Sequence, residues 1–111
     1  MGLSGTRLYM VGIGGIGMSA LAQYLVHAGK KVEGSDREES PVTELLSQKG
    51  ISIWIGHDGC NIPADTAALI YSDSVPSSNP ERVRARQMGI PEYSYFDALG
   101  EVSKGMRTIA I

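Results

Sequence analysis

Apolar and polar residues follow two different periods along the chain, and each period predicts its own kind of element. Short apolar runs bounded by glycine or polar residues are typical of buried strands. Such runs span residues 7–12, 31–36, 51–56, 67–72 and 107–111. A shorter apolar step at Ile90-Pro91 precedes Ser94. The pattern therefore predicts five to six strands, the last of them beginning at Arg107.

The segments between the strands carry the three- and four-residue spacing of amphipathic helices. One apolar face after the first strand consists of Met18, Leu21, Ala22, Leu25 and Val26. Further helices are predicted after three capping residues: Ser40-Pro41 opens a helix that stops at Gly50, Asn79-Pro80 caps a helix over 81–88, and Ser94 with Asp97 starts a helix through about Val102.

Strands that alternate with helices through short connections predict an α/β fold. We expect a Rossmann-like three-layer domain with a five- to six-stranded parallel sheet, covered by helices on both faces. Ligands of such folds bind beyond the carboxyl ends of the strands. The glycine-rich loop at 12–17, Asp36, and the loops at 56–61 and 72–79 each follow a strand. The sequence therefore predicts that they form one composite site.

Composition narrows the class of protein further. The 111 residues favour a single domain. A net charge of −2 gives no reason to expect nucleic acid or a membrane surface as partner. Cys60 is the one cysteine, which excludes an internal disulfide and favours a cytoplasmic location; we interpret it as an inert loop thiol. Arg82, Arg84 and Arg86 are interpreted as a solvated helix face.

The glycine loop carries the first chemical signal. Gly12, Gly14 and Gly17 form a G-x-G-x-x-G motif between a predicted strand and a predicted helix. Backbone N–H groups and the positive end of the helix dipole then face a diphosphate. The loop also approaches a P-loop, but Met18 stands where the lysine of a P-loop would be. A thioether cannot neutralise phosphate oxygens, so ATP is not expected in this loop.

Asp36 gives the second signal. It ends the second predicted strand, 19 residues after Gly17, where an acidic side chain accepts hydrogen bonds from ribose hydroxyls. A turn or helix-capping aspartate is the alternative interpretation. A diphosphate next to a ribose fits a nicotinamide dinucleotide and a nucleoside-diphosphate sugar equally well. These residues alone leave both ligands open.

Longer stretches of the chain resemble the N-terminal domain of the Mur ligase family, most closely the members that join L-alanine to UDP-N-acetylmuramic acid. The matching segments are GIGGIGMSALA at 12–22, GSD at 34–36, GHD-x-CN at 56–61, S-x-S-x-PSSNPE at 72–81 and VRARQMGIP at 83–91. The resemblance thus covers essentially the whole chain. A regulatory module that has lost its ligand, and an NAD-binding domain of an oxidoreductase or redox sensor, are the alternatives.

In that family, this domain binds the UDP part of UDP-N-acetylmuramic acid. The resemblance implies that a backbone cradle holds the pyrophosphate, made by Gly14, Gly15, Ile16, Gly17 and Met18. It implies that Asp36 holds the ribose and that the uridine pocket is bordered by His57, Asn61 and Ser72. Asp73 departs from the pattern, because the family usually has a serine there.

The resemblance also implies a domain organisation. We expect residues 1–111 to be one substrate-binding domain of a longer three-domain ligase, whose central and C-terminal domains would be its partners in the same chain. ATP and magnesium would serve the full-length enzyme. No catalytic residue and no metal ligand is expected within this chain, and alone it is expected to be inactive.

Overall fold

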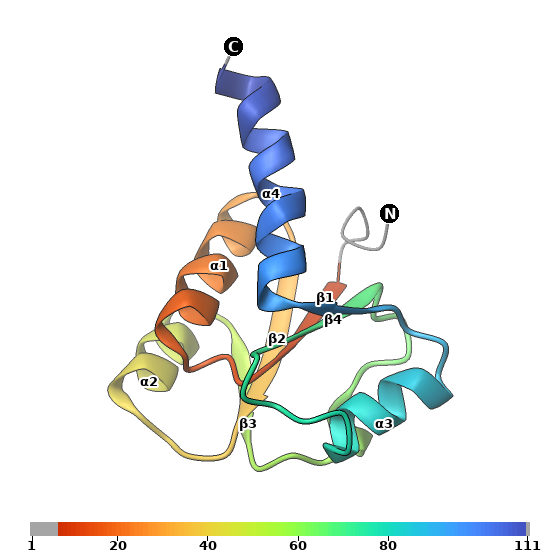
Figure 1. Ribbon diagram of the computed structural model, residues 1–111. Coiled ribbons are helices and arrows are strands. Elements are labelled where there is room, and N and C mark those ends of the chain that lie inside the picture. Colours follow the sequence, from red (N-terminus) through yellow and green to blue (C-terminus); the bar gives the residue numbers. More distant parts are fainter. Residues whose placement is uncertain (1–6, 111) are drawn as a thin grey trace.

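The computed structural model describes residues 7–110, with the side chains of residues 7–102 (Figure 1). The strands are β1 (Arg7–Val11), β2 (Lys31–Asp36), β3 (Ser52–Ile55), β4 (Ala68–Tyr71) and β5 (Glu92–Ser94). The helices are α1 (Ile16–His27), α2 (Pro41–Gln48), α3 (Pro80–Gln87) and α4 (Tyr95–Ala110), with a short 3₁₀ turn η2 (Gly59–Asn61). Within the described residues, none of the helices is both long and apolar enough to cross a membrane.

The strands form one parallel sheet in the order β3-β2-β1-β4-β5. This confirms the predicted α/β fold with its parallel sheet. The chain winds outward from β1 through β2 to β3, and then returns to place β4 on the other side of β1. The direction of winding therefore reverses at β1 and β4, and ligands of this fold class bind in the crevice at such a point.

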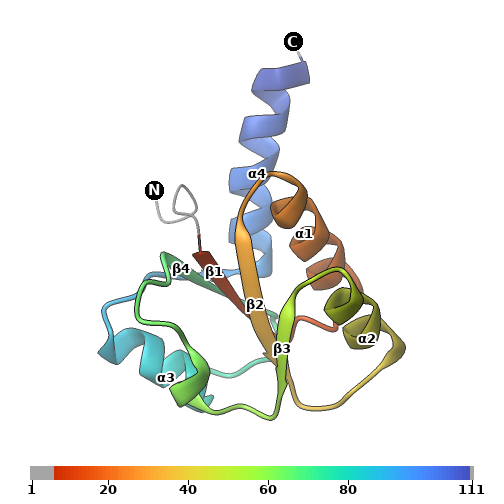
Figure 2. The ribbon, with the colours of Figure 1, turned by 180° about the vertical axis from the view of Figure 1, so that it is seen from behind.

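Alternation along β1 assigns the two faces of the sheet. Leu8 and Met10 point into the core formed with α1, α2 and α4, whereas Tyr9 and Val11 point into a second core under α3. Figures 1 and 2 show α3 on the opposite side of the sheet from α1 and α2. The predicted face of α1 is confirmed, because Met18, Leu21, Ala22 and Leu25 are buried and Val26 is partly buried against the same core.

Three of the predicted helix starts are capped as expected. Ser40 and Thr43 form a reciprocal capping box at α2, with each side-chain oxygen accepting the other residue's backbone N–H. Asn79 accepts the backbone N–H of Glu81 at 2.8 Å at the start of α3. Ser94 accepts that of Asp97 at 3.1 Å at the start of α4. These starts depend on residues two or three positions apart, which is why the sequence predicts them.

The predicted strand at Arg107–Ile111 is wrong for the residues that the structure describes, because α4 continues through Ala110. Thr108 and Ile109 favour strands by intrinsic propensity, but that preference is small and yields to context. No proline follows Ser94 to stop the helix. Helical hydrogen bonds are also local, whereas a strand needs a neighbour with which to pair. The sheet of the described residues accordingly has five strands.

The interpretation of the α3 arginines as a solvated face is wrong for Arg82. Its side chain is only 12% exposed and donates to Glu92 at 2.7 Å. Its guanidinium lies 3.5 Å from the centre of the Tyr71 ring, a cation–π contact. Arg84 is exposed as expected, and Arg86 also reaches Glu92. Residue spacing places an arginine on a helix but does not show which neighbours its long side chain reaches.

Candidate functional site

A cleft of about 520 Å³ lies at the carboxyl ends of the strands, where the loops after β1, β2, β3 and β4 meet. The glycine loop contributes Gly14 and Gly15, β2 ends in the cleft at Asp36, and the loop after β3 contributes His57. The loop after β4 contributes Ser72. The four loops that the sequence assigns to one site therefore do come together.

Gly12 makes the tight turn out of β1. Its φ of 82° lies in the left-handed region, and an added Cβ would lie 3.0 Å from the Cβ of Ser72. The turn is fixed because the N–H groups of Gly12 and Ile13 both donate to the carbonyl oxygen of Ser35, at 2.9 and 3.0 Å. The glycine loop is thereby tied to the end of β2.

The N-terminus of α1 presents backbone donors beside this turn. Gly15 is the N-cap, and no side chain of the described residues caps the helix. The first N–H groups of a helix have no acceptor within it, so those of Ile16, Gly17 and Met18 are available to an anion. Their side chains do not line the cleft: Ile16 is 89% exposed and Met18 is buried in the core. Only the backbone of this segment could meet a phosphate.

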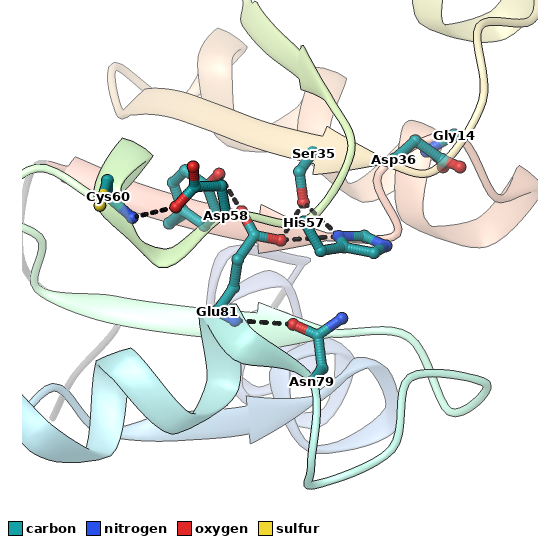
Figure 3. Close-up of polar contacts among 9 residues, drawn as sticks. Gly14, Ser35, Asp36, His57, Asp58, Cys60, Asn79 and Glu81 are labelled. Carbon is teal, nitrogen blue, oxygen red and sulfur yellow. Dashed lines mark hydrogen bonds and ion pairs between the residues drawn. The ribbon is translucent and has the colours of Figure 1, made fainter.

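Gly14, which the resemblance assigns to the pyrophosphate, lies next to Asp36 in the structure. Its N–H donates to Oδ2 of Asp36 at 2.8 Å (Figure 3). A Cβ on Gly14 would lie 2.7 Å from that oxygen and 3.1 Å from Cγ2 of Thr43. The missing side chain therefore leaves room for Asp36. Gly14 holds the carboxylate that the sequence assigns to the ribose.

Gly17 also has a neighbour that the glycine motif does not indicate. The motif predicts close packing of helix on strand at this position. In the structure, a Cβ on Gly17 would lie 2.7 Å from both Cζ and the hydroxyl oxygen of Tyr95, the first residue of α4. The third glycine thus allows close packing between α1 and the start of α4.

A buried polar network holds His57, which lines the cleft, and Figure 3 shows Glu81 at the centre of this network. The Glu81 carboxylate is fully buried, and its Oε1 lies 2.7 Å from Nδ1 of His57. The hydroxyl of Ser35 donates to the same oxygen, and the phenol of Tyr9 donates to Oε2. Burial, and then the hydrogen bond and charge of Glu81, raise the pKa of Tyr9 well above its ordinary range.

The remaining predicted residues are divided between the cleft and its surroundings. Ser72 lines the cleft, with its hydroxyl 3.3 Å from that of Ser74. Asn61 lies in η2 and is not among the residues that line this cleft. Asp73 is exposed and does not line it either. Exposed Cys60 donates its backbone N–H to Asp58, and this hydrogen bond lowers the pKa of the Asp58 carboxyl.

Charge is unevenly distributed around the cleft. The end of β2 contributes Asp36 to the cleft, and the segment after β2 contributes Arg37, Glu38 and Glu39. The N-terminus of α1 lies at the glycine loop instead. An anionic group is therefore favoured at the helix end, while the acidic segment favours hydrogen-bond donors such as hydroxyls. The cleft suits a ligand that carries both kinds of group.

Sequence reasoning did not identify three members of the buried network: Tyr9, Ser35 and Glu81. The register pairs Ser35 with Val11, so strand alternation puts Ser35 and Tyr9 on the α3 side of the sheet. Glu81 lies four residues before buried Ala85, which places both on the inner face of α3. An acidic residue at a buried helical position is the signal that could have identified it.

Comparisons with known proteins agree on one family. The model described as "Mur ligase family, catalytic domain" matches residues 7–107. A UDP-N-acetylmuramate–L-alanine ligase of Clostridium novyi is 43% identical over 99 residues, which cover 89% of this chain and 21% of that relative. The ligase of the same name from Streptomyces coelicolor is 39% identical over 105 residues, covering 95% and 23%. The chain thus spans about a fifth of the length of these curated relatives.

A solved structure gives the same result. The crystal structure of a UDP-N-acetylmuramate–alanine ligase from Thermotoga maritima matches with a TM-score of 0.85 at 37% identity, covering 88% of this chain and 23% of that chain. These similarities are to ligases, and they do not support the alternative interpretation as an NAD-binding domain of an oxidoreductase.

Proposed function

Since this chain belongs to the Mur ligase family, we propose that it is the domain that binds the UDP moiety of UDP-N-acetylmuramic acid. The enzyme would be a ligase that uses ATP to join L-alanine to this nucleotide sugar. The proposal rests on the names of the relatives and on the composition of the cleft.

One observation carries the assignment of the ligand: the cleft joins a helix N-terminus to an acidic wall. The pyrophosphate would accept hydrogen bonds from the backbone N–H groups of Ile16, Gly17 and Met18, while Gly15, whose N–H donates to the carbonyl oxygen of Gly12 at 3.2 Å, would complete the cradle as the N-cap. The ribose hydroxyls would donate to Asp36. A carboxylate has about four acceptor sites, so Asp36 can keep its bond from Gly14 and still accept from a hydroxyl.

His57 and Ser72 would then border the uridine, since both line the same cleft as Asp36. Asn61 stays a predicted contact of the same pocket, although it lies in η2, outside the cleft lining. Gly14 would act mainly through Asp36, because its N–H is already bonded to that carboxylate.

The amide-forming chemistry would need regions of the relatives that this chain does not match. The relatives are about four times as long as this chain, and we propose that ATP, magnesium and the catalytic residues belong to the regions that it does not match. The described residues would supply only the binding site for the nucleotide sugar. The isolated chain should therefore hydrolyse no ATP and form no amide.

Calorimetric titration of the chain with UDP, UDP-N-acetylmuramic acid and NADH tests the proposal. We expect UDP and the nucleotide sugar to bind, and NADH to bind far more weakly or not at all. A matched control is His27→Gln, which alters the end of α1 far from the cleft and should bind UDP like the unchanged chain. Saturable binding of NADH without a response to UDP would refute the proposal. No response to any of the three would favour a module that has lost its ligand.

A further inference from the structure

We infer that Glu81 is a positioning residue that fixes the tautomer of His57, so that Nε2 of His57 accepts a hydrogen bond from a donor group of the ligand. The inference deepens the proposed function, on which its ligand part rests. Its structural part concerns the free chain and can be tested without any ligand.

The first step is the hydrogen-bond inventory at the buried carboxylate. An ionised carboxyl group only accepts hydrogen bonds. Tyr9 must be a donor here, because burial raises its pKa and keeps the phenol protonated. Ser35 donates to the other oxygen, Oε1. Glu81 is thus the common acceptor of a network that belongs to α3, β1 and β2.

The second step follows from the contact with histidine. Nδ1 of His57 lies 2.7 Å from Oε1 of Glu81, and two acceptors would repel each other at that distance. Nδ1 therefore carries the hydrogen atom. In a neutral imidazole the other nitrogen is then an acceptor, and the hydrogen bond made by one ring nitrogen fixes the state of the other.

The third step is the exposure of the ring. His57 belongs to the loop after β3, its side chain is 21% exposed, and it lines the cleft, whereas Glu81 is fully buried. In Figure 3 the ring edge away from Nδ1 points away from Glu81. One edge of the ring is thus held by the protein interior while the other is available to a ligand.

The last step is the chemistry of the ligand. The donors of a uridine diphosphate are its ribose hydroxyls and the N–H at position 3 of uracil, and its remaining polar atoms accept. The Nδ1–H tautomer selects one of these donors and discriminates against a group that only accepts. The other tautomer would present a donor at Nε2 and lose this selectivity.

Nitrogen NMR of uniformly labelled chain near pH 8, above the range in which histidine usually titrates, reads the tautomer directly. The chain has two histidines, and the His27→Gln variant assigns the signals. We expect Nδ1 of His57 to be protonated and Nε2 to be unprotonated. A protonated Nε2, in the other tautomer or in the cation, would overturn the inference.

Glu81→Gln tests the role of the carboxylate. Glutamine at position 81 would keep its carbonyl oxygen as the acceptor for Tyr9 and would therefore turn its amide N–H towards Nδ1 of His57. Nδ1 then has to accept a hydrogen bond, so the ring hydrogen of His57 moves to Nε2. We expect this change in the spectrum together with a loss of UDP affinity of about tenfold. An unchanged tautomer in Glu81→Gln would show that Glu81 does not fix it.

Tyr9→Phe is the matched control. It removes a hydrogen bond from the same buried carboxylate and disturbs the same network, but it leaves the contact between Glu81 and His57 in place. We expect the tautomer to stay unchanged and UDP affinity to stay within about threefold. Equal losses of affinity in the two variants would show a merely structural role for Glu81.

The donor group is identified with 2′-deoxy-UDP, 3′-deoxy-UDP and N3-methyl-UDP. The analogue that lacks the donor facing Nε2 should bind more weakly to the unchanged chain and should lose little further affinity in Glu81→Gln. If all three analogues lose as much as UDP in Glu81→Gln, His57 accepts from none of these groups. The NMR result on the free chain is independent of UDP binding, so a failure of the proposed function remains distinguishable from a failure of this inference.

Discussion

Gly14→Ala should destabilise the chain because of Asp36, and not because of backbone strain. Gly14 is not among the described glycines with positive φ, so alanine can adopt its backbone conformation. The new methyl carbon would lie 2.7 Å from Oδ2 of Asp36 and 3.1 Å from Cγ2 of Thr43. Thr43 is buried and held in the capping box of α2. The Asp36 side chain therefore has to move, and it loses its hydrogen bond from Gly14.

The size of the effect follows from two opposing contributions. A hydrogen bond from an amide to a charged carboxylate contributes about 1.5–3 kcal/mol. Replacing glycine by alanine stabilises by about 0.4–1 kcal/mol, because the unfolded chain loses conformational freedom. We therefore expect a net loss of about 1–2 kcal/mol in the free energy of unfolding. For a domain of similar size, each kcal/mol corresponds to a fall of roughly 4–8 °C in Tm.

Urea unfolding of Gly14→Ala, Asp36→Ala and the double variant measures the coupling between the two residues. Without the Asp36 carboxylate the new methyl group loses its closest contact and keeps the looser one with Thr43, so the double variant should be more stable than the sum of the single effects by about 1–2 kcal/mol. Gly15→Ala is the matched control, since its Cβ would lie 3.6 Å from its nearest neighbour, an ordinary contact. Gly15 is the N-cap of α1, where glycine is preferred over alanine, but alanine also lowers the entropy of the unfolded chain; we expect the two effects to offset each other to within about 0.5 kcal/mol. Strictly additive effects, or an equal loss in Gly15→Ala, would refute the reasoning.

Two further predictions concern Asp36 and Tyr9. Asp36→Ala should weaken UDP binding by about 10- to 150-fold, in the lower half of this range because the carboxylate also repels the phosphates of the ligand. The same substitution should have little effect on the binding of 2′,3′-dideoxy-UDP, which lacks the ribose hydroxyls. An equal loss of affinity for both ligands would exclude Asp36 as the ribose acceptor. The raised pKa of Tyr9 means that above about pH 10 the unfolded chain releases a phenol proton that the folded chain keeps, so this contribution to stability is complete below that pH and declines above it. Urea unfolding between about pH 8 and 11 should show a shallower alkaline decline for Tyr9→Phe than for the unchanged chain, and identical slopes would contradict the assigned shift.

The parts of the fold that the sequence predicts are those determined by neighbouring residues. Caps at Ser40, Asn79 and Ser94 act over two or three positions, and the apolar face of α1 repeats within one helix. The order of strands and helices follows from the same local patterns. The site could be predicted to the level of loops, because parallel strands place their carboxyl ends on one edge of the sheet.

Apart from the strand predicted at Arg107–Ile111, where α4 continues through Ala110 instead, the failures involve contacts between distant segments. Arg82 of α3 reaches Glu92 of β5 and the ring of Tyr71 of β4. The network of Tyr9, Ser35 and Glu81 joins two strands and a helix through side chains that lie up to 72 residues apart. Periodicity shows which face of an element a residue occupies, but it does not show which polar partner lies there.

The glycine motif shows what sequence reasoning can and cannot predict. It correctly indicates three positions where a side chain is not accommodated, and each has a different physical reason. Gly12 requires a positive φ, Gly14 lies against Asp36, and Gly17 lies against Tyr95. Loss of UDP binding in a glycine variant would therefore not by itself demonstrate a phosphate contact. The donors available to a phosphate are backbone N–H groups at the start of α1, where the exposed side chain of Ile16 makes no contribution to the cleft lining. Evidence for that contact has to come from the ligand side, by comparing UDP with uridine, since removing the diphosphate tests the helix end without altering Asp36 or Tyr95.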